Sequence, residues 1–96
     1  MTAPIRRLAL DVDKVVDRPE MVGLARTIAE VSGVAAVNIT VNEIDIETVG
    51  TVVTVEGDDI DTDALFLAIE RAGAVLHSID EVVAGERIID HVLRVR

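Results

Sequence analysis

The spacing of hydrophobic residues alternates along the chain between a period of two and a period of three to four, which restricts the fold to layers of strands and helices. Period two predicts strands over residues 5–14, 34–41, 51–56 and 75–84. The longer period predicts two helices, one after Pro19 that ends at Gly33 and one after Asp61 that ends at Gly73. The predicted order of elements is therefore β-α-β-β-α-β.

This order is typical of the ferredoxin-like two-layer sandwich, an α+β fold. Such a fold has a four-stranded antiparallel sheet with strand order 4-1-3-2 and two helices on one face of the sheet. The chain has 96 residues and no linker or low-complexity segment. We therefore expect residues 1–96 to form a single ferredoxin-like domain.

Local signals add detail to this prediction. Pro19 is expected at the first position of the first helix, and Asp61 is expected to cap the second helix. Apolar residues change from odd to even positions after Asn42, which predicts a bulge or a segment that leaves the sheet. A turn is expected over residues 48–50, and residues 88–95 are expected to form a short extended or amphipathic tail.

The composition excludes several classes of function. The chain has a net charge of −9 and one aromatic residue, Phe66, so it is unsuited to binding nucleic acid. No apolar run approaches the roughly 18 residues that span a bilayer, and the N-terminus has no signal peptide, so we expect a cytoplasmic protein without membrane contact. With no cysteine, any metal would bind oxygen ligands or histidine, which favours hard cations.

The acidic, lysine-poor composition is also typical of proteins that work in a salt-rich cytoplasm. This indicates a halophilic source. The alternative is a GC-rich genome that encodes Arg, Ala, Val and Asp in preference to Lys.

The densest group of carboxylates is Glu43, Asp45 and Glu47, whose period of two points all three to one side of an extended chain. One interpretation is a solvated sheet edge that discourages aggregation. The other is a site for Ca²⁺ or Mg²⁺, because either cation would offset the repulsion among the acids.

A second polar cluster interrupts the fourth predicted strand and consists of His77, Ser78, Asp80 and Glu81. A single histidine on a strand is more often a hydrogen-bonded structural residue than a ligand or a base. Because the first and fourth strands are neighbours in the expected sheet, Asp11 or Asp13 would lie near Ser78 and Asp80, where a small polar pocket could form.

The expected strand order separates the two clusters within one subunit. The second and fourth strands lie at opposite edges, roughly 14 Å apart, so Glu43 or Asp45 would share an ion with Asp80 only between subunits. Pairing of one edge with the opposite edge of a neighbour is head-to-tail and can close into a ring. We therefore predict a homo-oligomer whose metal ligands, near its interfaces, are Glu43, Asp45, Glu47, Asp80 and Glu81.

Three segments resemble the archaeal domain-of-unknown-function family numbered 211, namely residues 5–12, residues 37–41 with 43–45 and Thr48, and residues 77–85. The resemblance implies a ferredoxin-like archaeal protein that assembles into a ring and, as in some members, binds a divalent cation such as Ca²⁺. It implies no established activity. The chain departs from the family pattern over residues 15–18, where Pro and His are usual, and at Ala74, where Gly is common.

Three classes of function follow from these observations. The first is a regulatory oligomer that binds a cation or a small-molecule ligand and is not an enzyme. The second is a structural or protein-interaction module. The third is a small enzyme in which His77 acts with Asp80 or Glu81 as acid and base, although standard enzyme motifs are absent from the sequence.

Overall fold

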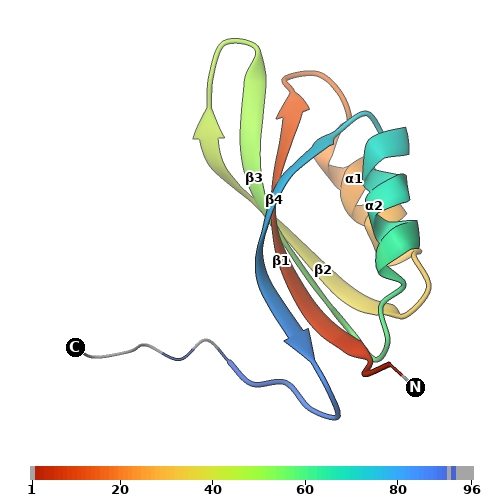
Figure 1. Cartoon of the computed structure of the whole chain (residues 1–96). Coiled ribbons are helices and arrows are strands. Elements are labelled where there is room, and N and C mark those ends of the chain that lie inside the picture. The colour runs from red at the N-terminus through yellow and green to blue at the C-terminus, as the bar shows by residue number, and fades with distance from the viewer. Residues whose placement is uncertain (1, 91, 93–96) are drawn as a thin grey trace.

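The computed structural model describes residues 2–90 and 92, and it contains six helices and strands in the predicted order (Figure 1). They are β1 (Ile5–Val15), α1 (Met21–Ala29), β2 (Val34–Ile44), β3 (Thr48–Gly57), α2 (Thr62–Arg71) and β4 (Val75–Ala84).

The four strands form one antiparallel sheet with the order β2-β3-β1-β4, which is the predicted order read from the other edge. Both helices lie against the same face of this sheet (Figure 1). The opposite face, called the open face below, carries Arg7, Ala9, Asp11 and Asp13 from β1 and their partners on β3 and β4. The ferredoxin-like α+β fold is thus confirmed.

The core lies between the sheet and the helices. On β1, Leu8, Leu10 and Val12 are buried and alternate with the residues of the open face. They pack in one cluster with buried side chains of the helices and of β3, among them Leu24, Ile28, Leu65, Ile69, Val53 and Val55. This alternation fixes which side chains of β1 reach the open face, because a shift of one residue would exchange the two sets.

The second helix follows the prediction at both ends, with Gly73 directly after its C-cap Ala72, whereas the prediction that the first helix ends at Gly33 is wrong, because that helix ends at Ala29. Gly33 and Gly73 have φ values of 86° and 93°, and the Asp61 carboxylate accepts a hydrogen bond from the amide of Ala64 at 3.1 Å. The expectation that Pro19 begins the first helix is wrong. The first helical hydrogen bond joins the Leu24 amide to the carbonyl of Glu20, so the helix begins at Met21.

The predicted bulge after Asn42 is present, because Val41 pairs with Thr51 and Glu43 pairs with Gly50, leaving Asn42 as the extra residue. The turn expected over residues 48–50 is wrong. The turn comes earlier, over residues 45–47, where the Asp45 amide donates to the carbonyl of Thr48 at 2.8 Å.

Residues 85–90 contain neither helix nor strand, so the expected tail has no regular structure over this part. The rest of that prediction falls partly outside the described residues, which omit 91 and 93–96. No helix within the described ranges is long and apolar enough to cross a membrane.

Candidate functional site

A polar hollow of about 260 Å³ lies at one end of the open face, beside the β2–β3 turn. It is lined by Asp11, Asp13, Asn42, Glu43, Asp45, Thr48, Gly50 and His77. We call it the acidic hollow. All four strands and the β2–β3 turn contribute to it, so residues far apart in the sequence meet there.

β1 contributes two carboxylates to the hollow because of its alternation. Asp11 and Asp13 flank the buried Val12 and project to the open face. On β3 the partner of Asp13 is Gly50, whose lack of a side chain leaves space. A Cβ atom at Gly50 would lie 3.0 Å from Oδ1 of Asn42 and 3.6 Å from Oδ1 of Asp13. Gly50 thus leaves open space between the side-chain oxygens of Asn42 and Asp13.

β2 contributes through its bulge. Because Asn42 is an extra residue in β2, it is Glu43 that pairs with Gly50 and lies on the open face. Asp45 follows in the turn, where its Oδ1 accepts a hydrogen bond from the amide of Ile46 at 2.7 Å. The parity change seen in the sequence is therefore the feature that aims these two predicted metal ligands into the hollow.

His77 of β4 completes the rim. Asp11 pairs with Ser78 and Val12 pairs with Leu76, so the register between β1 and β4 skips His77. This irregularity places His77 in the same hollow as Asp11 and Asp13. The polar pocket expected between Asp11 or Asp13 and the pair Ser78 and Asp80 is not formed by those residues, since β4 contributes His77 to the hollow and neither Ser78 nor Asp80 lines it.

The acidic hollow holds four carboxylates, from Asp11, Asp13, Glu43 and Asp45, and no Lys or Arg is among its described lining residues. In the described part of the chain, every ion pair involves Arg6 or Arg7, and none reaches the hollow. Four carboxylates at one site repel each other, so a bound cation would stabilise this arrangement.

The described residues do not contain a group of three or more His, Asp or Glu side chains arranged closely enough to hold a metal ion. The hollow of a single chain therefore offers oxygen ligands without a closed coordination shell. A hydrated ion, or an ion that takes further ligands from another molecule, suits such a site better than a bare ion.

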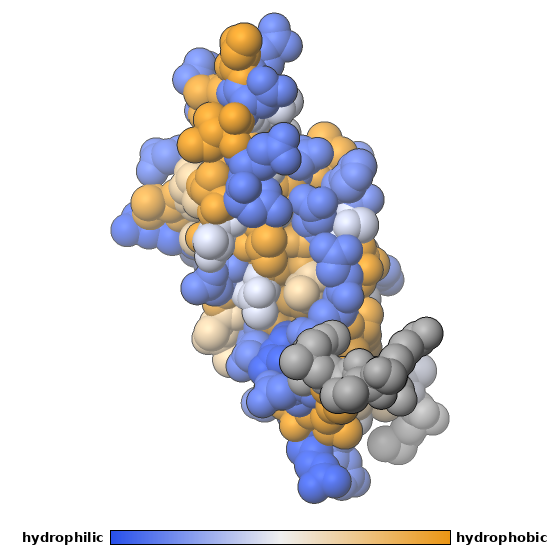
Figure 2. Space-filling model, turned by 90° about the vertical axis from the view of Figure 1, so that its left-hand side faces the viewer, coloured by the Kyte–Doolittle hydropathy of each residue, from blue (hydrophilic) through white to orange (hydrophobic). Residues whose placement is uncertain are grey.

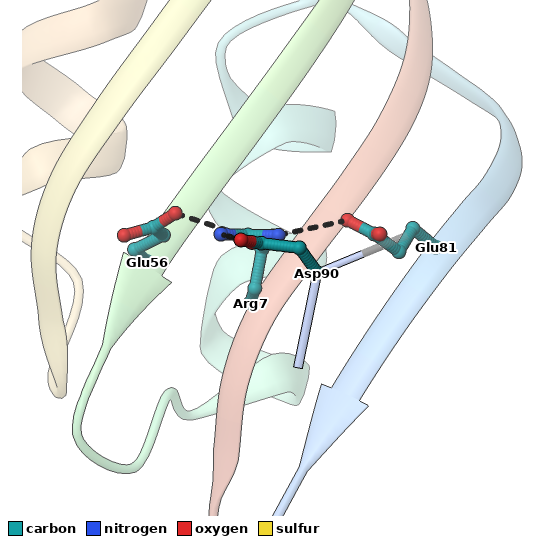
Figure 3. A network of polar contacts seen from close by, with 4 residues as sticks. All are labelled: Arg7, Glu56, Glu81 and Asp90. Atoms are coloured by element: carbon teal, nitrogen blue, oxygen red, sulfur yellow. Dashed lines mark hydrogen bonds and ion pairs between the residues drawn. The ribbon is translucent and has the colours of Figure 1, made fainter. Parts of the chain in front are cut away.

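The other end of the open face carries a different arrangement, the Arg7 cluster, consisting of Arg7, Glu56, Glu81 and Asp90 (Figure 3). Nε of Arg7 donates to Glu56 at 2.8 Å and Nη2 donates to Asp90 at 2.9 Å, while Nη1 lies 3.7 Å from Glu81. Hydrogen bonds to Asp90 and Glu56 raise the pKa of Arg7 above its ordinary value. The guanidinium thus stays charged and offsets the charge of these carboxylates.

The remaining predicted ligands lie outside the acidic hollow. Glu47 is an exposed residue of the β2–β3 turn. Asp80 accepts a hydrogen bond from Ser78 at 2.8 Å, and Glu81 belongs to the Arg7 cluster. The sequence prediction singled out neither Asn42 nor Gly50 as part of the site. The signal that could have found them is the bulge itself, since it fixes which residues share a face with Asp13.

Large apolar side chains are exposed on both edge strands and on the β2–β3 turn. Ile44 and Ile46 at the β2–β3 turn are 74% and 91% exposed, and on β4 Ile79 and Val82 are about half exposed. Figure 2 shows the mixed character of this side of the molecule, with hydrophobic residues next to hydrophilic ones.

The fold and the hollow define a class, a ferredoxin-like α+β protein with an acidic hollow on the open face of its sheet. The chain belongs to the DUF211 family, described as uncharacterized ArCR, whose model matches residues 6–96. It is 46% identical over 88 residues to the uncharacterized protein MJ0319 of Methanocaldococcus jannaschii, covering 92% of this chain and 90% of that protein.

Proposed function

We propose that the protein is a homo-oligomer that binds a divalent cation, Ca²⁺ or Mg²⁺, or a small ligand in the acidic hollow, in a regulatory rather than catalytic role. The observation that carries this proposal is the set of four carboxylates in the hollow without an Arg or Lys beside them among the described lining residues. Glu43 and Asp45 would act as ligands together with Asp11 and Asp13.

The chemistry of the hollow fits a hard cation. Its lining offers carboxylate, amide and hydroxyl oxygens, the ligand atoms that Ca²⁺ and Mg²⁺ prefer. The space over Gly50 lies between oxygens of Asn42 and Asp13. A volume of about 260 Å³ accommodates an ion with several waters, since each water takes roughly 30 Å³.

The oligomer completes such a site. β2 and β4 are the outer strands of the sheet, and apolar side chains are exposed on both, including Ile44 on β2 and Val82 on β4. Exposed apolar edge strands favour association. In a head-to-tail arrangement the β4 strand of a neighbour would bring Asp80 towards Glu43, Asp45 and Glu47, and thereby supply the ligands that one chain lacks.

Two other functions are less well supported. A structural or interaction module would explain the exposed Ile44 and Ile46, but would leave the acidic hollow without a role. An enzyme that uses His77 with Asp80 or Glu81 would need one of these acids beside the histidine. In the described part of the chain, Asp80 instead accepts a hydrogen bond from Ser78, and Glu81 forms an ion pair with Arg7.

The test combines thermal melting with light scattering in high-salt buffer, first with EDTA and then with millimolar Ca²⁺ or Mg²⁺. Because a ligand present at 100 times its Kd adds about 2.7 kcal/mol to the free energy of unfolding, we expect the Tm to rise by several degrees. Glu43→Gln and Asp45→Asn should reduce this rise. An unchanged mass and Tm across EDTA and both ions would overturn the proposal.

Two further variants separate charge from space. Gly50→Ala keeps every charge but places a methyl group 3.0 Å from Oδ1 of Asn42, so it should weaken the rise in Tm caused by the cation. Asp58→Asn removes an exposed carboxylate that pairs with Arg6, away from the hollow, and should leave that rise unchanged. If Asp58→Asn reduced the rise in Tm as strongly as Glu43→Gln, the cation would be screening the charge of the whole protein and not binding in the acidic hollow.

A further inference from the structure

The chain reverses direction directly after β4, at a point that is fixed to the start of β1. Gly85 has a φ of 119°, a conformation that favours glycine. Its amide donates to the carbonyl of Pro4 at 2.9 Å, and its own carbonyl accepts from Nε of Arg6 at 2.7 Å. Gly85 is therefore a defined pivot for the segment that follows.

Residues 86–90 return from this pivot to the open face. Asp90 meets Arg7 there, with Oδ1 accepting a hydrogen bond from Nη2 at 2.9 Å (Figure 3). The side chain of Asp90 is 85% exposed, and Ile89 is 62% exposed. Ile88, which is 38% exposed, buries part of its apolar surface, and the ion pair of Asp90 is the attraction in this segment that salt can screen.

Arg7 does not depend on Asp90 for its charge balance. Glu56 and Glu81 remain beside the guanidinium when Asp90 is absent. The three carboxylates outnumber the one guanidinium, so Asp90 is attracted by Arg7 and repelled by Glu56 and Glu81. Exposed ion pairs contribute little to stability and are screened by salt. Asp90 has the most exposed carboxylate of the cluster, so its contact is the one that salt screens most.

We propose that residues 86–90 form a releasable strap, with Gly85 as its pivot and the Arg7–Asp90 ion pair as its latch. In the closed state Asp90 occupies Nη2 of Arg7. In the open state, which high ionic strength favours, Nη2 becomes accessible to a carboxylate of another molecule. The latch is separated from the acidic hollow by four residues of β1, about 13 Å, so the strap does not depend on cation binding.

The absence of cysteine allows a direct test. Ile89→Cys provides a single attachment point for a nitroxide, whose distance from the sheet is measured by the broadening of backbone amide signals in NMR. At low salt we expect strong broadening near Glu56 on β3. Adding Asp90→Asn, or molar salt, should reduce the paramagnetic relaxation rate there by roughly two- to fivefold, the range expected for loss of an exposed ion pair.

Asp58→Asn in the labelled protein is the matched control, because Asp58 is a fully exposed acid paired with the neighbouring Arg6 at 3.2 Å. It should leave the broadening near Glu56 unchanged. Relaxation that is insensitive both to Asp90→Asn and to salt would show a permanently packed segment and overturn the proposal. Weak relaxation at low salt in the otherwise unaltered protein would overturn it too, because no closed state would exist.

Discussion

The two ends of the open face are built from the same strand and with the same kind of residue, yet they differ in charge balance. At the start of β1, Arg7 stands among carboxylates from β3, β4 and the C-terminal segment. Four residues later, Asp11 and Asp13 stand among further acids without a guanidinium. At one end a guanidinium offsets part of the negative charge, and at the other no Lys or Arg is among the described lining residues.

Lys14 makes this contrast sharper, because it lies next to Asp13 in sequence and could have neutralised the hollow. Its side chain instead points to the helix side of the sheet, where the residue is only 6% exposed. There Nζ donates to the carbonyls of Val15 and Val16, each at 3.1 Å. The alternation of β1 thus directs this cation away from the acidic hollow, and the difference between the two ends follows from the parity of the strand.

The largest effect is expected from Arg7→Gln. Without the guanidinium, Glu56, Glu81 and Asp90 would face each other unneutralised, and the Tm should fall by several degrees. Thermal unfolding followed by circular dichroism measures this. Arg26→Gln, which removes the same charge from an exposed position of α1, is the control. Equal losses in the two variants would mean that the cluster contributes no more than net charge.

A smaller loss is expected from Glu56→Gln. This substitution keeps the shape of the side chain but removes one charge-assisted hydrogen bond to Arg7, and it should lower the free energy of unfolding by about 0.5–1 kcal/mol. Urea denaturation at low and high salt measures the change. Because Glu56 is partly exposed, the loss should shrink as salt increases. If Glu56→Gln instead stabilised the protein, the Arg7 cluster would carry surplus negative charge even when Glu56 is paired with Arg7.

The sequence predicts the fold well because the fold depends on hydrophobic period, which is a local signal. Leu8, Leu10 and Val12 alternate, the two helices carry apolar stripes, and Asp61 caps as expected. The parity change after Asn42 likewise predicts the bulge. Pro19 did not define the start of the first helix, because proline suits both the first position of a helix and the bend before it.

The composition of the site was harder to predict because it depends on register. Glu43 and Asp45 were identified, but their joining with Asp11, Asp13 and His77 depends on two irregularities, one in each edge strand. The Arg7 cluster was missed altogether. Arg7 and Asp90 are separated by 83 positions, and no periodicity links a residue of β1 to a segment without regular structure.

The smallest expected effect has the opposite sign and tests the hollow itself. Asp13→Asn removes one of four neighbouring carboxylates while keeping the size and an oxygen of the side chain. In EDTA it should raise the free energy of unfolding by about 0.5 kcal/mol, because repulsion between facing carboxylates is relieved. With saturating Ca²⁺ or Mg²⁺ the sign should reverse, since the variant then loses a ligand that the cation uses. Urea denaturation in both conditions measures the two values.

The control for Asp13→Asn must account for the net charge of −9, because removing any acid lessens the repulsion across the whole molecule. Asp59→Asn does this at an exposed position after β3, outside the hollow. Only the stabilisation by Asp13→Asn beyond that of Asp59→Asn reports on the hollow. If Asp13→Asn instead destabilised the protein in EDTA, Asp13 would be a neutralised carboxylate, and the contrast between the two ends of the open face would be lost.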